Sequence, residues 1–183
     1  MLTFDTYDIS IGTQEHYSPD VEQSYSDTCA IKSASLILHS RGIDVTEDGL
    51  RRVAELHGWY TPGHGTDVAH LGDLLNLYGL DAELHYGGTI QDLMHLTSQG
   101  IQPMLALDSG ELWNPGFAER MEDILLGGNP DHALIFNGGE IDPLSGDFHV
   151  ILTDPGTGDL LTDQYGSEQF LDAWADSGFL YVA

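Results

Sequence analysis

Residues 26–38 read Ser-Asp-Thr-Cys-Ala-Ile-Lys-Ser-Ala-Ser-Leu-Ile-Leu and contain the only cysteine of the chain, Cys29. The apolar side chains of this stretch recur at helical spacing: Ile31, Ala34, Ile37 and Leu38. The spacing predicts a helix, and the capping residues Ser26 and Asp27 place Cys29 in its first turn. Free backbone amides and the helix dipole favour a thiolate there. The thiolate is the reactive form of cysteine, so this helix start is the first candidate site.

Helical patterns continue to about residue 98. Three more helices are expected, each between a capping residue and a glycine: Thr46 to Gly58, Thr66 to Gly79, and Thr89 to Gly100. The sequence Gly63-His64-Gly65 predicts a loop between the first two of them. Residues 1–24 are polar and weakly patterned, and they predict a strand or an extended lead-in.

The pattern changes to strands after residue 100. Short apolar or alternating runs predict strands over residues 101–107, 132–136, 148–152 and 179–182. Asp142-Pro143-Leu144-Ser145-Gly146 is typical of a hairpin turn, and Ser167 is expected to cap a late helix. Helices followed by strands indicate an α+β domain. Residues 111–131, with a helix expected at 117–126, are interpreted as an insertion that covers a site.

The length of 183 residues and the 41% hydrophobic content predict one domain, 1–183, with one core. A single cysteine cannot form an internal disulfide. The start of the chain lacks the basic and apolar regions of a secretory signal, and no segment has transmembrane length. We therefore expect no membrane insertion and a cytoplasmic location, with secretion by a signal-free route left open.

The chain is strongly acidic, with 30 Asp and Glu residues against 5 Lys and Arg residues. This balance argues against nucleic acid or an anionic membrane as a partner, because both require a basic face. The acidic surface favours solubility, or it attracts cationic peptides or divalent ions. A peptide or protein substrate is the expected partner, and the sequence leaves the oligomeric state open.

Cysteine catalysis needs a base, a group that orients the base, and donors for the oxyanion. His132 begins an apolar strand, and Asp154 ends the next strand, where antiparallel pairing brings the two together. Gln23 lies six residues before Cys29 and is the candidate oxyanion donor. His149 competes with His132 as the base, although it is expected on the same strand as Asp154. Asp154 is also explained by its Asp-Pro-Gly turn, and Cys29 by burial as a small apolar residue.

Three histidines, His57, His64 and His70, lie close enough in sequence to suggest zinc. They lack neighbouring cysteines and the spacing of a zinc motif. The aspartates between Asp142 and Asp163 do not follow the order of a calcium-binding loop. We therefore predict neither a metal nor a cofactor.

The residues together resemble the bacteriocin-processing, double-glycine peptidase family of the papain-like cysteine peptidases. The resemblance spans roughly residues 20–183 and is carried by short motifs: Gln23, Asp27-Thr28-Cys29, the strand led by His132, Asp154-Pro155-Gly156-Thr157-Gly158, and the closing stretch 167–174. The chain has Ala30 where members commonly have glycine, and a longer connection between His132 and Asp154. Its Gly87-Gly88 pair lacks the Lys-Ser or Lys-Thr of a nucleotide-binding loop, so the resemblance does not imply leader removal coupled to export.

The resemblance implies a papain-like α+β fold, with the cysteine in an N-terminal helical part and the histidine and aspartate in a C-terminal antiparallel sheet. It implies Cys29 as nucleophile, His132 as general base and acid, Asp154 as its orienting partner and Gln23 as oxyanion donor. The implied reaction is peptide hydrolysis through a thioester, with a Gly-Gly type substrate. Two alternatives stay open: an acyl or amide transferase with the same triad, and a catalytically silent domain that binds a peptide or protein.

Overall fold

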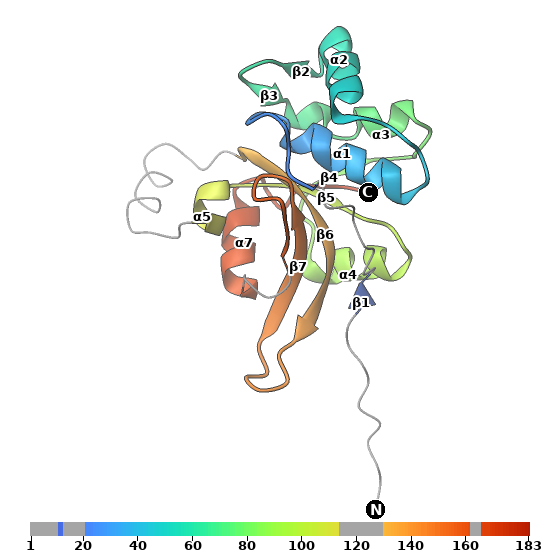
Figure 1. Ribbon diagram of the computed structural model, residues 1–183. Coiled ribbons are helices and arrows are strands. Elements are labelled where there is room, and N and C mark those ends of the chain that lie inside the picture. Colours follow the sequence, from blue (N-terminus) through green and yellow to red (C-terminus); the bar gives the residue numbers. More distant parts are fainter. Residues whose placement is uncertain (1–10, 13–20, 114–129, 162–165) are drawn as a thin grey trace, which may run out of the picture.

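The chain combines an N-terminal helical part with an antiparallel sheet formed largely by its C-terminal half (Figure 1). A computed structural model describes residues 11–12, 21–113, 130–161 and 166–183. Within these residues the helices α1 to α3 gather at one end of the molecule, and the long hairpin of β6 and β7 projects toward the other (Figure 1). This is the α+β arrangement that the sequence predicted.

Three of the predicted helices form as expected: α1 (Cys29–Ser40), α2 (Glu47–His57) and α4 (Ile90–Ser98). The Thr46 side chain accepts a hydrogen bond from the Gly49 amide at the start of α2. Gly58 ends α2 in the left-handed conformation, at φ 76°. Thr89 begins α4 with a capping box, in which its own side chain and that of Asp92 each accept a backbone hydrogen bond. Local capping chemistry therefore determines where α2 and α4 begin.

The predicted helix from Thr66 to Gly79 is wrong. The stretch forms a small hairpin strand and two short turns of helix: β3 (Gly65–Thr66), the 3-10 helix η1 (Val68–His70) and α3 (Asp73–Leu77). Thr66 pairs with Tyr60 of β2 (Tyr60–Thr61) as the last residue of this hairpin, so the first helical turn begins later, at Val68. Asp67 caps η1 in its place. The predicted loop at Gly63-His64-Gly65 becomes the turn and the first paired residue of this hairpin.

One antiparallel sheet holds the strands of the C-terminal half in the order β4-β9-β5-β6-β7-β8, and β1 pairs with β6. The strands are β1 (Ile11–Gly12), β4 (Leu84–His85), β5 (Met104–Leu107), β6 (His132–Ile141), β7 (Phe148–Asp154), β8 (Asp159–Leu161) and β9 (Tyr181–Val182). Residues 101–103 precede β5 because Ile101 still donates to Leu96 at the end of α4. The strand predicted over residues 179–182 is reduced to β9 for a similar local reason, since Phe179 donates to Trp174.

Two hydrophobic clusters cover the two faces of the sheet. Alternate residues of β5 and β6, including Met104 and Ile135, pack with α1 to α3. The intervening residues, including Leu105 and Leu134, pack with the other helices, α4, α5 (Ser109–Trp113) and α7 (Ser167–Ala175). Because both faces are covered, β5 is buried along its whole length. The sheet is therefore a rigid middle layer between two groups of helices.

The late helix, the proposed insertion and the N-terminal lead-in complete the comparison with the predicted elements. Ser167 was expected to cap the late helix, but it is the first residue of α7, and Gly166 occupies the capping position. The proposed insertion, residues 111–131, falls mainly on residues 114–129, which lie outside the described residues, as does the helix expected at 117–126. Within the predicted lead-in, the described residues Ile11 and Gly12 form a short strand.

Gly139 offers a test of the packing within the β6–β7 hairpin. A Cβ atom at this position would lie 2.9 Å from the His149 carbonyl oxygen and would overlap the Phe148 ring. We expect Gly139→Ala to lower the free energy of unfolding by about 1–3 kcal/mol, measured by urea denaturation. Gly166→Ala, where a Cβ would meet nothing within 4 Å, is the comparison variant and should cost less, because only the preference for glycine over alanine at the start of α7 is lost. Equal stability of Gly139→Ala and wild type would contradict this description of the hairpin.

Candidate active site

A buried histidine and a buried aspartate meet across β6 and β7. His132 Nε2 and Asp154 Oδ1 are 2.7 Å apart, and the side chains are 6% and 0% exposed. The pairing of Ile135 with Thr153 sets the register of the two strands and places Asp154 diagonally across from His132. His132 therefore has a buried carboxylate partner of the kind that the predicted base requires.

Cys29 lies on the other side of His132. It is the first residue of α1, is partly exposed, and its thiol is within hydrogen-bonding reach of the His132 ring. Since His132 uses Nε2 for Asp154, the remaining ring nitrogen, Nδ1, is the atom that can face the thiol. The structure thus brings together Cys29, His132 and Asp154, three of the four residues that the sequence singled out.

The charge of this group follows from its contacts. Burial by itself would lower the pKa of His132, but hydrogen bonds to Asp154 and Cys29 and the negative charges of both raise the pKa to about 10. The imidazole is therefore protonated at neutral pH. A protonated imidazole beside a thiol favours the thiolate.

The helix that carries Cys29 is fixed directly to the strand that carries His132. The hydroxyl of Ser33, one turn after Cys29, donates to the carbonyl of Ala133 at 3.3 Å. Both Ser33 and Ala133 are buried. This contact and the surrounding apolar cluster set the distance between the thiol and the imidazole.

Asp154 performs two tasks. Its Oδ1 atom accepts from the Gly156 amide at 2.7 Å as well as facing His132, and its carbonyl accepts from the Gly158 amide at 3.1 Å. The two sequence interpretations, a turn residue and a histidine partner, are therefore compatible. The turn holds the carboxylate still, which also fixes the orientation of the imidazole.

Gln23 is tied to the same turn, yet its side chain is placed differently from the expectation. Its backbone amide donates to the Pro155 carbonyl at 2.9 Å. The side-chain Nε2 donates to the Tyr25 carbonyl at 2.6 Å, and Gln23 does not line the cavity around Cys29. The Gln23 side chain therefore does not face Cys29 in this structure, as the predicted oxyanion donor would.

The cap of α1 also differs from the prediction. Thr28 occupies the capping position, and its side chain makes no capping hydrogen bond. The carboxylate of Asp27 does not cap the helix, because it accepts from the Tyr60 hydroxyl at 2.9 Å and the Gly63 amide at 2.6 Å. The predicted cap was wrong because these partners are distant in sequence.

These bonds attach the β2–β3 hairpin to the start of α1. Burial alone would raise the pKa of Asp27, but the hydrogen bonds from Gly63 and Tyr60 outweigh it and lower that pKa. Burial and the Asp27 hydrogen bond raise the pKa of Tyr60 to about 12. Asp27 is therefore ionised and Tyr60 neutral throughout the neutral range, so the attachment holds there.

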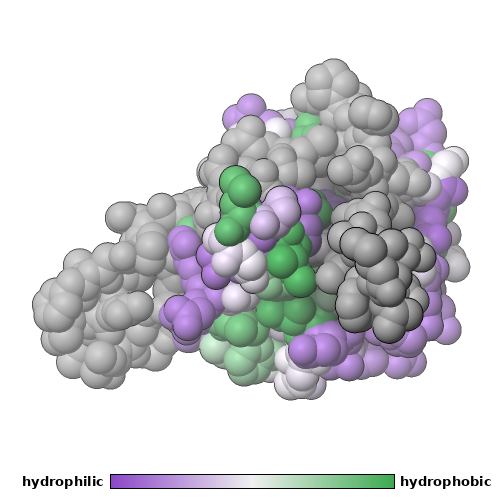
Figure 2. Space-filling view, turned by 90° about the horizontal axis from the view of Figure 1, so that it is seen from below, coloured by the Kyte–Doolittle hydropathy of each residue, from purple (hydrophilic) through white to green (hydrophobic). Residues whose placement is uncertain are grey.

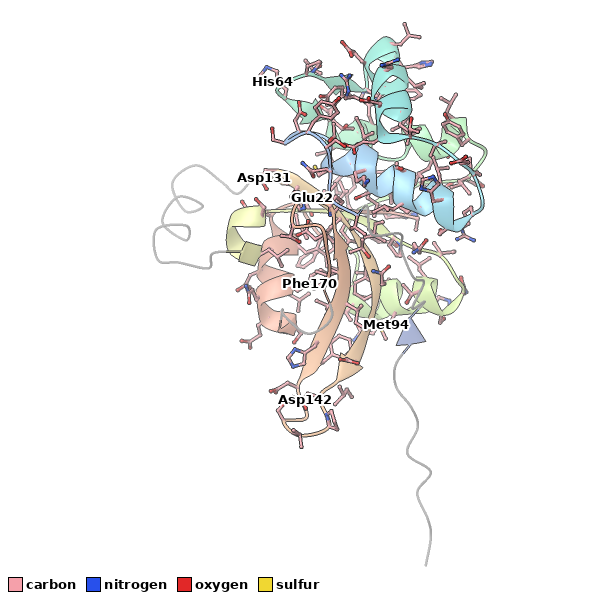
Figure 3. All side chains as sticks on the ribbon, in the orientation of Figure 1. Glu22, His64, Met94, Asp131, Asp142 and Phe170 are labelled. Atoms are coloured by element: carbon pink, nitrogen blue, oxygen red, sulfur yellow. The ribbon has the colours of Figure 1, made fainter. Side chains whose placement is uncertain are left out.

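A cavity of about 380 Å³ opens between this hairpin and the start of β6. Its lining includes Asp27, Cys29 and Ala30 at the start of α1, Gly63 to Thr66 of the hairpin, and Pro130 to Ala133 around the start of β6. Figure 3 shows His64 of the hairpin and Asp131 before β6 on the same side of the molecule. Cys29 and His132 thus line one cavity.

A second and larger cavity, about 930 Å³, lies away from Cys29. Its apolar lining comes from α4, β7, α7 and the segment before β9: Ile90, Met94, Phe148, Leu171 and Phe179. Figure 2 views the molecule from the end with the β6–β7 turn and shows hydrophobic residues gathered beside hydrophilic ones. Cys29, His132 and Asp154 do not line this second cavity.

The histidines considered for zinc have separate surroundings. His57 stacks on Trp59, His70 bonds Asp73 at 2.7 Å, and His64 lines the cavity near Cys29. Among the described residues, no group of three or more His, Cys, Asp and Glu side chains is arranged to hold a metal ion. In the same part of the chain, no helix has the length and apolar character needed to cross a bilayer.

The raised pKa of His132 gives a direct prediction. Asp154→Asn removes the carboxylate, so the pKa of His132 should fall from about 10 toward or below its ordinary value of about 6.5. The measurement is an NMR pH titration of histidine Cε1 signals, with the His132 signal assigned by its loss in His132→Gln. Asp73→Asn, which removes the partner of His70, is the matched control. A His132 titration that Asp154→Asn leaves unchanged would refute the pairing.

Tyr60 gives a second prediction about the cavity wall. Tyr60→Phe deletes the hydroxyl that donates to the ionised Asp27, and we expect a loss of about 1.5–3 kcal/mol in the free energy of unfolding. Tyr25→Phe deletes the exposed hydroxyl bond to Asp48 and should cost less. Chemical denaturation of both variants measures the difference. Equal losses would show that the hairpin attachment adds nothing beyond a surface bond.

Comparison with known proteins identifies the fold. No family model and no curated protein sequence matches the chain. The crystal structure of a double glycine motif protease from an AMS/PCAT transporter in complex with the leader peptide matches with TM-score 0.56 and 14% identity, over 88% of this chain and 86% of that one. The peptidase domain of Streptococcus ComA, a bi-functional ABC transporter involved in a quorum sensing pathway, matches with TM-score 0.61 and 15% identity, over 88% and 93%. The chain therefore has the papain-like α+β fold of double-glycine peptidase domains.

Proposed function

We propose that the protein is a cysteine peptidase that hydrolyses a peptide bond through a thioester. The observation that carries the proposal is the position of His132 between the Asp154 carboxylate and the Cys29 thiol. Such an arrangement activates a cysteine nucleophile, because the oriented imidazolium stabilises the thiolate. The fold shared with two peptidase domains supports the same reaction class.

In the first half of the reaction the Cys29 thiolate attacks the carbonyl carbon of the substrate peptide bond, forming a carbon–sulfur bond. The carbonyl electron pair moves to oxygen. When the intermediate collapses, the carbon–nitrogen bond breaks and His132 donates its proton to the leaving amine. The products of this half are a thioester on Cys29, a free amine and a neutral imidazole held in place by Asp154.

In the second half water replaces the amine. Neutral His132 accepts a proton from the water as its oxygen attacks the thioester carbonyl. Collapse of this intermediate breaks the carbon–sulfur bond and releases the acid product. Cys29 returns as a thiolate and His132 as an imidazolium, so the starting ion pair is restored.

The oxyanion of both intermediates is assigned to the Cys29 backbone amide and the free Nε2 hydrogen of Gln23. The second assignment requires the Gln23 side chain to turn toward the cavity while its backbone remains bonded to Pro155. Its Oε1 atom is buried and has no hydrogen-bond partner among the described residues. The turn breaks the 2.6 Å hydrogen bond from Nε2 to the Tyr25 carbonyl, and the bond that Nε2 donates to the oxyanion replaces it. A donor of this kind changes kcat about 10²- to 10³-fold in acyl transfer.

The substrate is proposed to be a peptide with a Gly-Gly sequence before the cleaved bond. The support comes from the structural neighbours, one described as a double glycine motif protease in complex with a leader peptide. The formal net charge of −25 adds a preference for peptides with basic residues, because opposite charges speed their encounter.

Cleavage of a peptide panel tests the proposal. We expect a peptide with an internal Gly-Gly to be cut after the second glycine, and Cys29→Ala to abolish the cut, as measured by mass spectrometry. Adding basic residues to the peptides should raise kcat/KM at low salt, and this increase in kcat/KM should become smaller as salt is added. Cys29→Ala should remain folded, because the thiol is partly exposed.

The same peptide experiments distinguish a peptidase from the two alternative functions, a transferase and a catalytically silent binding domain. An added amine that becomes joined to the acyl group in preference to water would show a transferase. A peptide that binds without being cut, with equal affinity for wild type and Cys29→Ala, would show a silent binding domain and overturn the peptidase proposal.

A further inference from the structure

Glu47, the first residue of α2, makes an unusual set of contacts for a carboxylate. It is 8% exposed. Its two oxygens accept from the Ser24 amide at 3.0 and 3.1 Å, and Oε2 accepts from the Ser24 hydroxyl at 2.9 Å. Its Oε1 accepts from the Thr28 hydroxyl at 2.5 Å. One buried side chain therefore binds both ends of the segment 24–28.

The two ends of this segment adjoin the proposed chemistry. Gln23 directly precedes Ser24, and Cys29 directly follows Thr28. The backbone also holds both ends of the segment, since the Thr28 amide donates to the Tyr25 carbonyl at 3.4 Å and the Gln23 amide donates to the Pro155 carbonyl at 2.9 Å. The Glu47 carboxylate thus fixes the separation between Gln23 and Cys29.

The charge of Glu47 is balanced from α1. Lys32 Nζ lies 3.9 Å from Glu47 Oε2, and the two side chains are 6% and 7% exposed. Lys32 is three residues after Cys29, on the next turn of the same helix. A buried carboxylate needs such compensation, because desolvation of an unpaired charge is costly. The ion pair therefore allows an ionised acceptor to lie behind the nucleophile.

We propose that Glu47 is a positioning residue, which holds the oxyanion donor Gln23 and the nucleophile Cys29 at the spacing that the tetrahedral intermediate requires. The inference rests on the proposed function and adds a residue to it. Glu47 does not line the cavity around Cys29 and acts only through the segment 24–28.

The chemistry of the contacts makes a carboxylate necessary. Both Glu47 oxygens accept hydrogen bonds, one mainly from Thr28 and the other from Ser24. A glutamine accepts at only one position and presents an N–H donor at the other, where it meets a donor. Glu47→Gln therefore releases one end of the segment while keeping the size of the side chain.

A purely structural role predicts a different result from a positioning role. If Glu47 only stabilises the fold, the folded molecules of Glu47→Gln are fully active. The measured kcat and the iodoacetamide rate of Cys29 then fall together, as the folded fraction falls. If Glu47 sets the spacing, the oxyanion step suffers while the Cys29–His132 contact stays intact. Alkylation of Cys29 by iodoacetamide needs no oxyanion donor, so it separates the two roles.

The experiment measures kcat and KM for a cleaved peptide, and the iodoacetamide rate of Cys29, in wild type, Glu47→Gln and Glu55→Gln. Glu55 lies on α2 and pairs with Arg51 at the surface, so Glu55→Gln is the matched control. For folded Glu47→Gln we expect kcat to fall about 10- to 100-fold, with KM and the iodoacetamide rate changed less than about threefold. The control should match wild type.

Thr28→Val is the second variant, because it frees the Cys29 end and leaves the Lys32–Glu47 ion pair in place. This variant tests the same role if Glu47→Gln does not fold. Its kcat should fall by the same factor, while the iodoacetamide rate of Cys29 stays close to that of wild type. An unchanged kcat in a folded variant, or equal losses of kcat and alkylation, would overturn the positioning role alone. A wild-type protein that cleaves no peptide would overturn the proposed function, and the positioning role with it.

Discussion

The contact between His132 and the buried Asp154 carboxylate governs the site. It holds a positive charge on an imidazole that burial would otherwise keep neutral. That charge is what gives the thiol of Cys29 its proposed reactivity. Each part of the surrounding fold can be understood as fixing one member of this group: the β6–β7 register places the carboxylate, and the Asp154 turn prevents it from rotating.

The nucleophile is fixed by contacts that are long-range in sequence. Ser33 attaches α1 to β6, Asp27 attaches the β2–β3 hairpin to the start of α1, and Glu47 holds the segment before Cys29. The helices α1 and α2 and the β2–β3 hairpin therefore cover the sheet and also hold Cys29 in place. They form the wall of the cavity and set the spacing of the groups inside it, while the sheet supplies a rigid floor.

The sequence predicted those features that depend on local chemistry. The capping threonines Thr46 and Thr89 and the apolar periodicity gave α1, α2 and α4, and the turn residues after Asp154 placed it at a strand end. Prediction failed where a distant partner decides the outcome. Thr66 is extended because it pairs with Tyr60, and Asp27 turns away from the helix to meet Gly63. Glu47 was missed because it sits beyond the predicted cap Thr46 as an ordinary first-turn acid, and only the fold brings Ser24 and Thr28 to it.

Because the chain has a single cysteine, the charge state of the Cys29 thiol can be measured directly. The ultraviolet absorbance of the thiolate, taken as the difference between wild type and Cys29→Ala, reports the charge state of Cys29 at each pH. We predict a thiolate signal at neutral pH that disappears in His132→Ala and persists in His149→Ala. A wild-type protein without that signal at neutral pH, or with the same signal after loss of His132, would contradict this prediction.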